Sequence, residues 1–204
     1  PVDEKFALVP DTESIVKELS LNPQYKTILI MGGGGGMLPM DEIVLCCEDI
    51  DTNLQIIAVT GHNTSIYNKL LAIKPKLRQR VEVLGYVDNI SELMAVADLI
   101  ISKPGGVTTA ETLCRGLPMI IYRPIPGQEE GNTHYLTNCQ AALRADSLKE
   151  IQGMIKKLFI EEPKMLMTLQ QNSLKLSQPQ SANKIAEYVF SKISASSVLR
   201  TKPV

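Results

Sequence analysis

The most chemically suggestive part of this sequence is the segment Ser102–Glu111, which reads SKPGGVTTAE. Pro104 stiffens a turn, the two glycines after it free the backbone, and Thr108 and Thr109 open a helix whose first N–H groups have no partner within the helix. Such a helix start binds phosphate groups. Glu111, about one turn later, could accept hydrogen bonds from a ribose diol. Helix capping by threonine, with Glu111 favouring the helix dipole, is the alternative explanation.

Five consecutive glycines, Gly32–Gly36, directly follow the apolar run KTILIM. Without Cβ atoms, Gly33, Gly34 and Gly35 would let the backbone approach a phosphate closely. The run does not fit GxGxxG, because no third glycine stands at the required spacing, and it lacks the Gly-Lys-Ser/Thr ending of a Walker A loop. A flexible turn is the plain alternative.

The loop Gly85–Asn89 follows another apolar run and offers an aromatic and a β-branched side chain. Tyr86 and Val87 could cover a flat base, while backbone groups hydrogen-bond to its edge. Ordinary packing at the end of a strand is the alternative for both residues.

The segment Arg123–Asn132 reads RPIPGQEEGN and follows the run PMIIY. Its prolines and first glycine fix an extended turn that presents Gln128, Glu129 and Asn132 together. Amide and carboxylate groups suit the hydroxyl groups of a sugar. The alternative is a charged surface loop.

These four loops each follow a short apolar run, and this alternation predicts an α/β fold with a Rossmann-like parallel sheet flanked by helices. Ligands of such sheets bind beyond the carboxyl ends of the strands, so we expect all four loops at one edge. The second apolar run ends in AVTGHN, without the acidic residue that holds the ribose of NAD, which disfavours a dinucleotide-binding domain. The expected strands are residues 26–31, 54–60, 81–84, 98–102, 118–122 and 141–144. Helices are expected at 91–97, 107–115, 147–159 and 182–193, with a break at Glu162-Pro163.

Composition and charge disfavour several other classes of function. The 204 residues are 44% hydrophobic and 21% charged, and the net charge of -1 gives no general attraction to nucleic acid. No apolar run reaches the roughly 20 residues needed to cross a bilayer. Neither His62 nor His134 has a partner at metal-site spacing, so we expect no metal and no cofactor. The cysteines have no CxxC spacing, and we interpret all of them as buried free thiols: Cys46 and Cys47 in a helix-like stretch, Cys114 and Cys139.

The chain is interpreted as one domain between two appendages. Residues 1–10 read as an extended linker, residues 11–193 as a single domain, and residues 194–204 as a flexible tail, because they are small, polar and unpatterned. The sequence begins at Pro1 without an initiator methionine, which we interpret as an excised piece of a longer protein.

Taken together, SKPGGVTTAETLCRGLP and PIPGQEEGN strongly resemble the C-terminal, donor-binding domain of the family 28 lipid glycosyltransferases with the GT-B fold. That group includes monogalactosyldiacylglycerol synthases and processive diacylglycerol glucosyltransferases. The resemblance runs from the opening PVDEKF, which is similar to an interdomain linker, to about Tyr188. The PGG-x-T-x-x-E and PGQE-x-x-N motifs at this separation are specific to it.

The resemblance implies a role for each candidate residue. The UDP-binding residues would be Gly33, Gly34, Gly35, Tyr86, Val87, Gly106, Thr108, Thr109 and Glu111, with Tyr86 and Val87 beside uracil and Glu111 at the ribose. The sugar-binding residues would be Gln128, Glu129 and Asn132. The catalytic base is expected in an amino-terminal domain that this sequence lacks.

The function implied by the resemblance is inverting transfer of a hexose, glucose or galactose, from a UDP-hexose to diacylglycerol in glycolipid synthesis. This sequence would be the UDP-sugar-binding domain, inactive alone, of a hexosyltransferase that is cytoplasmic and peripheral at the membrane. The missing domain would contact the acceptor lipid and the membrane surface. Two alternatives stay open: a separate donor-binding subunit of an N-acetylglucosaminyltransferase that needs a partner chain, and a UDP-N-acetylglucosamine 2-epimerase, against which the PGQE loop argues.

Overall fold

A six-stranded parallel sheet organises the chain, in the strand order β3-β2-β1-β4-β5-β6. The computed structural model describes residues 2–8, 10–33 and 38–199, with side chains up to Ile193. The strands are β1 (Lys26–Met31), β2 (Leu54–Val59), β3 (Arg80–Leu84), β4 (Leu99–Ser102), β5 (Met119–Tyr122) and β6 (Ala142–Ala145). The predicted α/β, Rossmann-like fold is confirmed, and each predicted strand is present. The order of the strands reverses between the neighbours β1 and β4.

The sheet is buried on both faces, which explains why its strands are continuous apolar runs. Every side chain of β2 is buried. Successive residues of β1 point to opposite layers, so Ile28 and Ile30 join one hydrophobic cluster, whereas Leu29 and Met31 join the other. The two clusters hold the sheet between two helical layers.

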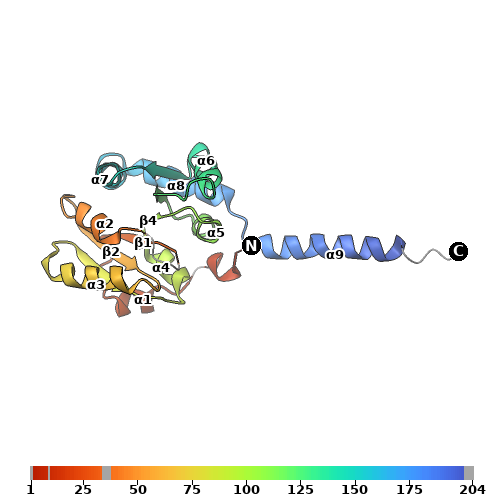
Figure 1. Ribbon diagram of the computed structural model, residues 1–204, viewed down its shortest axis with the longest axis horizontal. Coiled ribbons are helices and arrows are strands. Elements are labelled where there is room, and N and C mark those ends of the chain that lie inside the picture. The colour runs from red at the N-terminus through yellow and green to blue at the C-terminus, as the bar shows by residue number, and fades with distance from the viewer. Residues whose placement is uncertain (1, 9, 34–37, 200–204) are drawn as a thin grey trace.

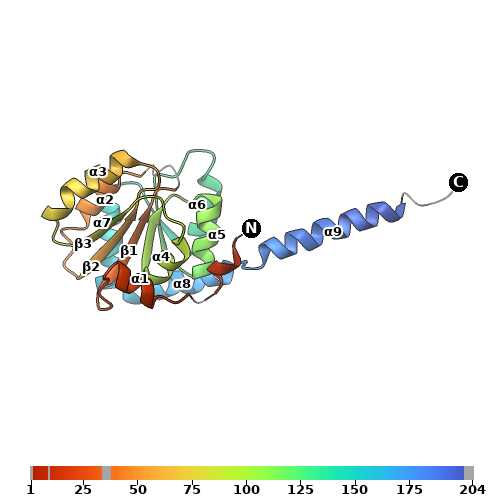
Figure 2. The ribbon, with the colours of Figure 1, turned by 90° about the horizontal axis from the view of Figure 1, so that it is seen from below.

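Figures 1 and 2 show these helical layers on either side of the sheet. One layer contains α2 (Met40–Cys46), α3 (Thr64–Ile73), the 3-10 turn η2 (Lys74–Lys76), α7 (Leu148–Lys156) and the π-helical turn η3 (Lys157–Glu161). The other contains α1 (Glu13–Glu18), α4 (Ile90–Val96), α5 (Gly106–Arg115) and α6 (Glu130–Asn138). Helix α8 (Pro163–Leu176) starts at the predicted break and contacts both clusters, through Leu169 and Leu176.

Several local features differ from the sequence-based expectations. Helices α1, α3 and α6 lie outside the predicted ranges, because each is short and shows little apolar periodicity. Helix α6 begins at Glu130, so the end of RPIPGQEEGN is a helix start rather than a loop. The cysteines are free, as predicted, but only Cys47 is fully buried, and the other three are half-buried.

The segment interpreted as a linker at the start of the chain packs against the domain. It contains the 3-10 turn η1 (Glu4–Phe6), and Phe6 is only 2% exposed. The guanidinium of Arg115, on α5, donates to the carbonyl oxygens of Lys5 and Leu8 and lies 5.8 Å from the centre of the Phe6 ring. Residues 2–8 are therefore held on the domain by the buried Val2 and Phe6 side chains and by Arg115 of α5.

Helix α9 (Ser181–Leu199) projects away from the body, as both views show. It continues beyond Ile193, where a tail was expected, and residues 200–204 lie outside the described part of the chain. Among its described side chains, five that are large and apolar are exposed: Ile185, Tyr188, Val189, Phe190 and Ile193. None of the helices in the described residues is both long enough and apolar enough to cross a membrane.

Candidate functional site

The parallel sheet brings the predicted loops to one edge, beyond the carboxyl ends of the strands. The loops after β1 and β4 leave neighbouring strands where the strand order reverses. Open α/β sheets bind their ligands at such a reversal. The loops after β2, β3 and β5 flank this point on both sides.

The start of α5 is an uncapped helix end. Its N-cap, Gly105, is extended and supplies no side-chain cap, and the first backbone bond of the helix runs from Thr109 N to Gly105 O over 2.8 Å. The Thr109 hydroxyl is buried and has no hydrogen-bond partner among the described residues. Gly106 is exposed, and a Cβ atom there would have nothing within 4 Å. Threonine therefore does not cap this helix, and its first N–H groups are open to an anion.

The loop after β5 is fastened to the loop after β4. Asn132 donates from Nδ2 to the carbonyl oxygen of Pro104 over 2.8 Å. Glu129, which is 8% exposed, accepts a hydrogen bond from Ile125 N over 2.7 Å, and a Cβ atom at Gly105 would lie 3.6 Å from Glu129 Oε1. The starts of α5 and α6 are thus linked by a hydrogen bond and lie close together.

Gln128 stands at the exposed tip of the same loop. The chain turns sharply beside it, with a left-handed backbone at Gly127 (φ 76°) and at Arg123 (φ 50°). Gln128 is therefore the predicted sugar-binding residue most open to a ligand, whereas Glu129 and Asn132 also serve the structure of the loop.

Glu111 is half-buried on α5, beside the fastened residues 2–8. Burial raises the pKa of its carboxyl group, nearby Lys5 lowers this pKa, and nearby Asp3 raises it. The site therefore holds a carboxylate that is costly to ionise unless hydrogen-bond donors reach it.

Tyr86 and Val87 lie differently, although they are adjacent. Val87 packs against the hydrophobic cluster of the α5 layer, which is ordinary packing at a strand end. Tyr86 is 60% exposed, and its ring stacks on that of His62, with centroids 4.6 Å apart and an angle of 11° between the planes. No role at the site was predicted for His62 from the sequence. The available signal was its place directly after β2, at the same edge as the other loops.

The glycine loop is described only in part. Gly33 adopts a left-handed backbone with φ 71°, which glycine tolerates best, and a Cβ atom there would meet nothing within 4 Å. Gly34 and Gly35 lie outside the described residues, so their predicted contact with the diphosphate stays a prediction.

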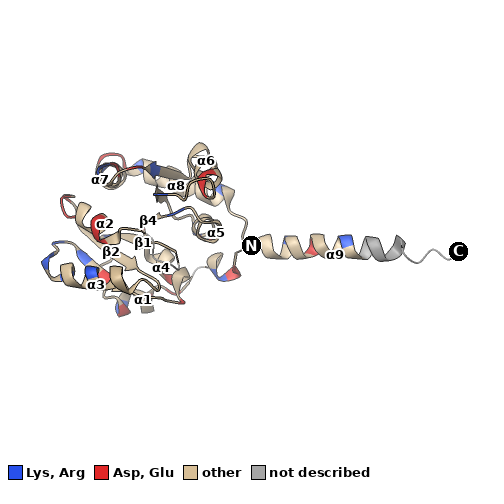
Figure 3. Ribbon diagram, viewed as in Figure 1, with Lys and Arg blue, Asp and Glu red and all other residues tan. Residues whose placement is uncertain are grey.

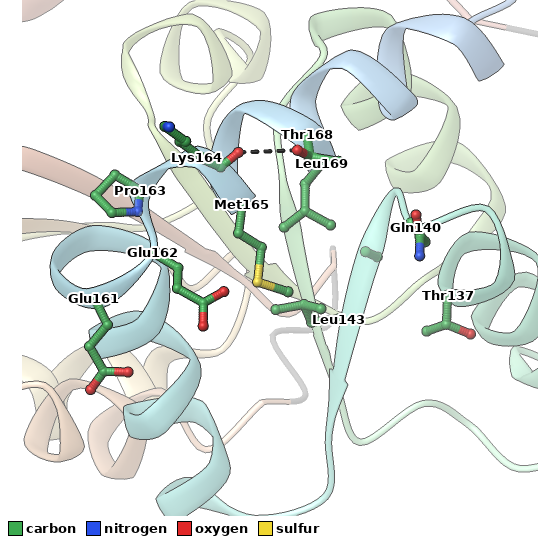
Figure 4. Close-up of a pocket in the computed structure, with 11 residues that line it drawn as sticks. Thr137, Gln140, Leu143, Glu161, Glu162, Pro163, Lys164, Met165, Thr168 and Leu169 are labelled. Atoms are coloured by element: carbon green, nitrogen blue, oxygen red, sulfur yellow. Dashed lines mark hydrogen bonds between the residues drawn. The ribbon is translucent and has the colours of Figure 1, made fainter.

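A groove of about 700 Å³ lies at the other end of the sheet, where β6 begins. Figure 4 shows the apolar side chains of Leu143, Met165 and Leu169 near its centre, with Glu161 and Glu162 on one side and Thr137 and Gln140 on the other. The predicted residues do not line it. Lys, Arg, Asp and Glu residues are interspersed over the body (Figure 3). In the part of the chain that the structure describes, no three His, Cys, Asp or Glu side chains gather in a group that could hold a metal ion.

Comparison with known proteins assigns the family. Residues 27–188 match the model described as the glycosyltransferase family 28 C-terminal domain. The chain belongs to this family. The match includes β2 to β6, all of β1 except Lys26, and the loops after β4 and β5, so the resemblance seen in the PGG and PGQE segments is confirmed.

Among curated relatives of this family 28 domain, the processive diacylglycerol beta-glucosyltransferase of Bacillus subtilis is 34% identical over 164 residues, which cover 79% of this chain and 42% of the relative. The probable chloroplastic monogalactosyldiacylglycerol synthase of Nicotiana tabacum is 32% identical over 193 residues, covering 91% of this chain and 36% of the relative. The chain spans less than half the length of these relatives.

The family 28 domain also resembles solved structures. Anabaena Alr3699/HepE, solved in complex with UDP-glucose, has a TM-score of 0.70 at 16% identity, over 95% of this chain and 55% of that one. At this identity the similarity concerns the fold.

Proposed function

We propose that this family 28 domain binds the UDP-sugar donor of an enzyme that transfers a hexose to diacylglycerol. The observation that carries the proposal is the uncapped start of α5. The Asn132–Pro104 hydrogen bond holds it beside the loop after β5, which contains Gln128 and Glu129. The curated relatives support this substrate class, because two of them are named processive diacylglycerol beta-glucosyltransferase and probable monogalactosyldiacylglycerol synthase.

The donor would lie along the carboxyl edge of the sheet. The diphosphate would meet the free N–H groups from Gly106 onward and the hydroxyls of Thr108 and Thr109, with the glycine loop after β1 opposite. Glu111 would accept the ribose hydroxyls, and Tyr86 with Val87 would flank the uracil.

The hexose would lie beside the loop after β5. Gln128 and Glu129 would bind its hydroxyl groups, and Asn132 would contribute its Oδ1 oxygen, because its amide nitrogen is already bonded to Pro104. Glu129 and Asn132 are already held by hydrogen bonds, which suits recognition because these two side chains lose little freedom on binding.

The chemistry would be a displacement with inversion at the anomeric carbon. The diacylglycerol hydroxyl attacks that carbon, its proton passes to a base, and the bond to the diphosphate oxygen breaks. The helix start of α5 stabilises the charge that develops on the leaving UDP. The base, the acceptor site and the contact with the membrane surface would come from the rest of the full-length enzyme.

The two alternative functions are not favoured. A UDP-N-acetylglucosamine 2-epimerase and an N-acetylglucosaminyltransferase subunit both use a UDP-sugar, so the donor site alone does not separate them. The names of the curated relatives favour a hexosyltransferase acting on diacylglycerol.

Two measurements test the proposal. UDP-glucose or UDP-galactose at ten times its dissociation constant should stabilise the isolated chain by about 1.4 kcal/mol, which is about 3–6 °C in melting temperature. The full-length enzyme should form labelled glycolipid from diacylglycerol and one of these donors, whereas the isolated chain should form none. Absence of both a thermal shift and calorimetric heat with millimolar donor would refute donor binding.

A further inference from the structure

The loops after β2 and β3 are joined by hydrogen bonds where they leave the sheet. The backbone N–H and the hydroxyl of Thr60 both donate to Leu84 O, over 2.8 and 3.0 Å. A Cβ atom at Gly85 would lie 3.9 Å from Gly61 O, so the two backbones run almost in contact. The residues that follow, His62 and Tyr86, are therefore presented side by side.

His62 sits in a turn with a fixed backbone. Thr64 N donates to His62 O, and Asn63 N donates to Thr60 O, each over 3.1 Å. The Asn63 side chain then caps α3 by accepting a hydrogen bond from Ile66 N over 3.0 Å. The backbone of His62 is thus fixed at the start of α3, whereas its side chain is exposed and the Tyr86 ring is 60% exposed.

Both residues of the stacked pair are exposed on the surface of the protein. With planes 11° apart and centroids at 4.6 Å, the imidazole covers one face of the phenol ring. An exposed aromatic pair at the ligand-binding edge of the sheet gives a planar group a flat surface to stack on. Aromatic platforms of this kind accept any base, because every base has a π face.

We propose that His62 is a positioning residue, which holds the Tyr86 ring as a preformed stacking platform for the base of a nucleoside diphosphate. This inference rests on the proposed function and deepens it, because it assigns the base end of the donor site to a pair of loops. The platform contributes affinity, whereas preference for uracil comes from the hydrogen bonds that backbone groups make to the edge of the base.

Calorimetry on the isolated chain tests the pair with UDP, CDP and inorganic pyrophosphate. His62→Ala and Tyr86→Ala should each weaken UDP and CDP by about 2- to 10-fold and leave pyrophosphate unchanged. The double variant should bind no more weakly than Tyr86→Ala alone, since the two rings act together. His62→Phe, which keeps a ring, should bind within about twofold of the parent. The matched control, His134→Ala, should match the parent.

The outcomes separate the two hypotheses. A parent chain that binds no nucleotide refutes the proposed function and the platform with it. If the parent binds UDP, the proposed function stands, and three results would each overturn the role given to His62. These are a UDP affinity of His62→Ala equal to that of the parent, additive losses of affinity in the double variant, and a changed ratio of UDP to CDP affinity. NMR of the ligand-free chain adds a check on the stack, because the ring-current shift of the His62 protons should disappear in Tyr86→Ala.

Discussion

At the residue scale, substitution of Gly106 tests whether the start of α5 binds a diphosphate or is only an exposed helix end. Gly106→Ala and Gly153→Ala both add a methyl group to a helix where nothing lies within 4 Å. Both should leave the unfolding free energy unchanged or raise it by up to about 1 kcal/mol. Only Gly106→Ala should weaken UDP binding, by at least about 10-fold, because its methyl group would obstruct the diphosphate. Equal UDP affinity for the two variants, measured by calorimetry, would count against the site.

Glu111 gives the site a predictable dependence on pH. Burial raises the pKa of its carboxyl group, and the ribose hydroxyls would donate to the ionised form. Affinity for UDP-glucose, whose diphosphate stays ionised throughout, should therefore rise between about pH 4 and 7 as Glu111 loses its proton. Glu111→Gln should flatten that rise, and an unchanged slope would remove Glu111 from the site.

The same raised pKa has a consequence for the ligand-free fold. A group whose pKa is raised on folding stabilises the folded state at acid pH, and this contribution is lost as the pH rises through the folded-state value. The unfolding free energy of Glu111→Gln minus that of the parent should therefore be larger at neutral pH than at acid pH. Denaturant unfolding at the two pH values measures the difference.

The sequence predicts which residue types gather at the site better than it predicts their partners. Glu129 carries the carboxylate expected for a sugar, yet one of its oxygens accepts a hydrogen bond from Ile125 N. Asn132 bonds to Pro104, and His62 stacks on Tyr86. Each of these last two pairs joins loops that follow different strands, so no local pattern could reveal either contact.

At the scale of elements, Gly116 controls how α5 packs on α8. It ends α5 with a left-handed backbone (φ 61°), and a Cβ atom there would lie 2.6 Å from Leu174 Cγ. Gly116→Ala should therefore lower the unfolding free energy by roughly 2–4 kcal/mol, through backbone strain and overpacking together. Adding Leu174→Ala should restore only the packing part. Chemical denaturation of the single and double variants measures both parts, and full recovery would exclude backbone strain.

The predictability of each element follows from its burial. The strands are continuous apolar runs because both faces of the sheet are covered, and they could be placed closely from sequence. Helix α3 has only Leu70 fully buried, so it lacks the apolar stripe that identifies a helix. The weak pattern of α3 reflects an exposed position, which only the assembled fold reveals.

At the scale of the whole molecule, α9 is separable from the body. Its side chains from Ala182 to Ile193 are exposed, and deleting residues 181–204 should shift the melting temperature by no more than about 2 °C. The deletion should also reduce self-association, because it removes the exposed apolar side chains of α9. Calorimetry and light scattering of both forms check this. A large fall in melting temperature would show that α9 supports the body.

The hydrogen bond from Asn183 Nδ2 to Glu4 Oε1, 3.3 Å long, places the start of α9 beside the first turn of the chain. The polypeptide therefore enters and leaves the body at nearly one point, a geometry that tolerates insertion into another protein. The body could be grafted as a cassette into an exposed loop of a fluorescent protein, with short linkers at both junctions. Its carboxyl edge would remain accessible, so the grafted domain should still bind a nucleotide sugar, and calorimetry of the fusion protein would check this.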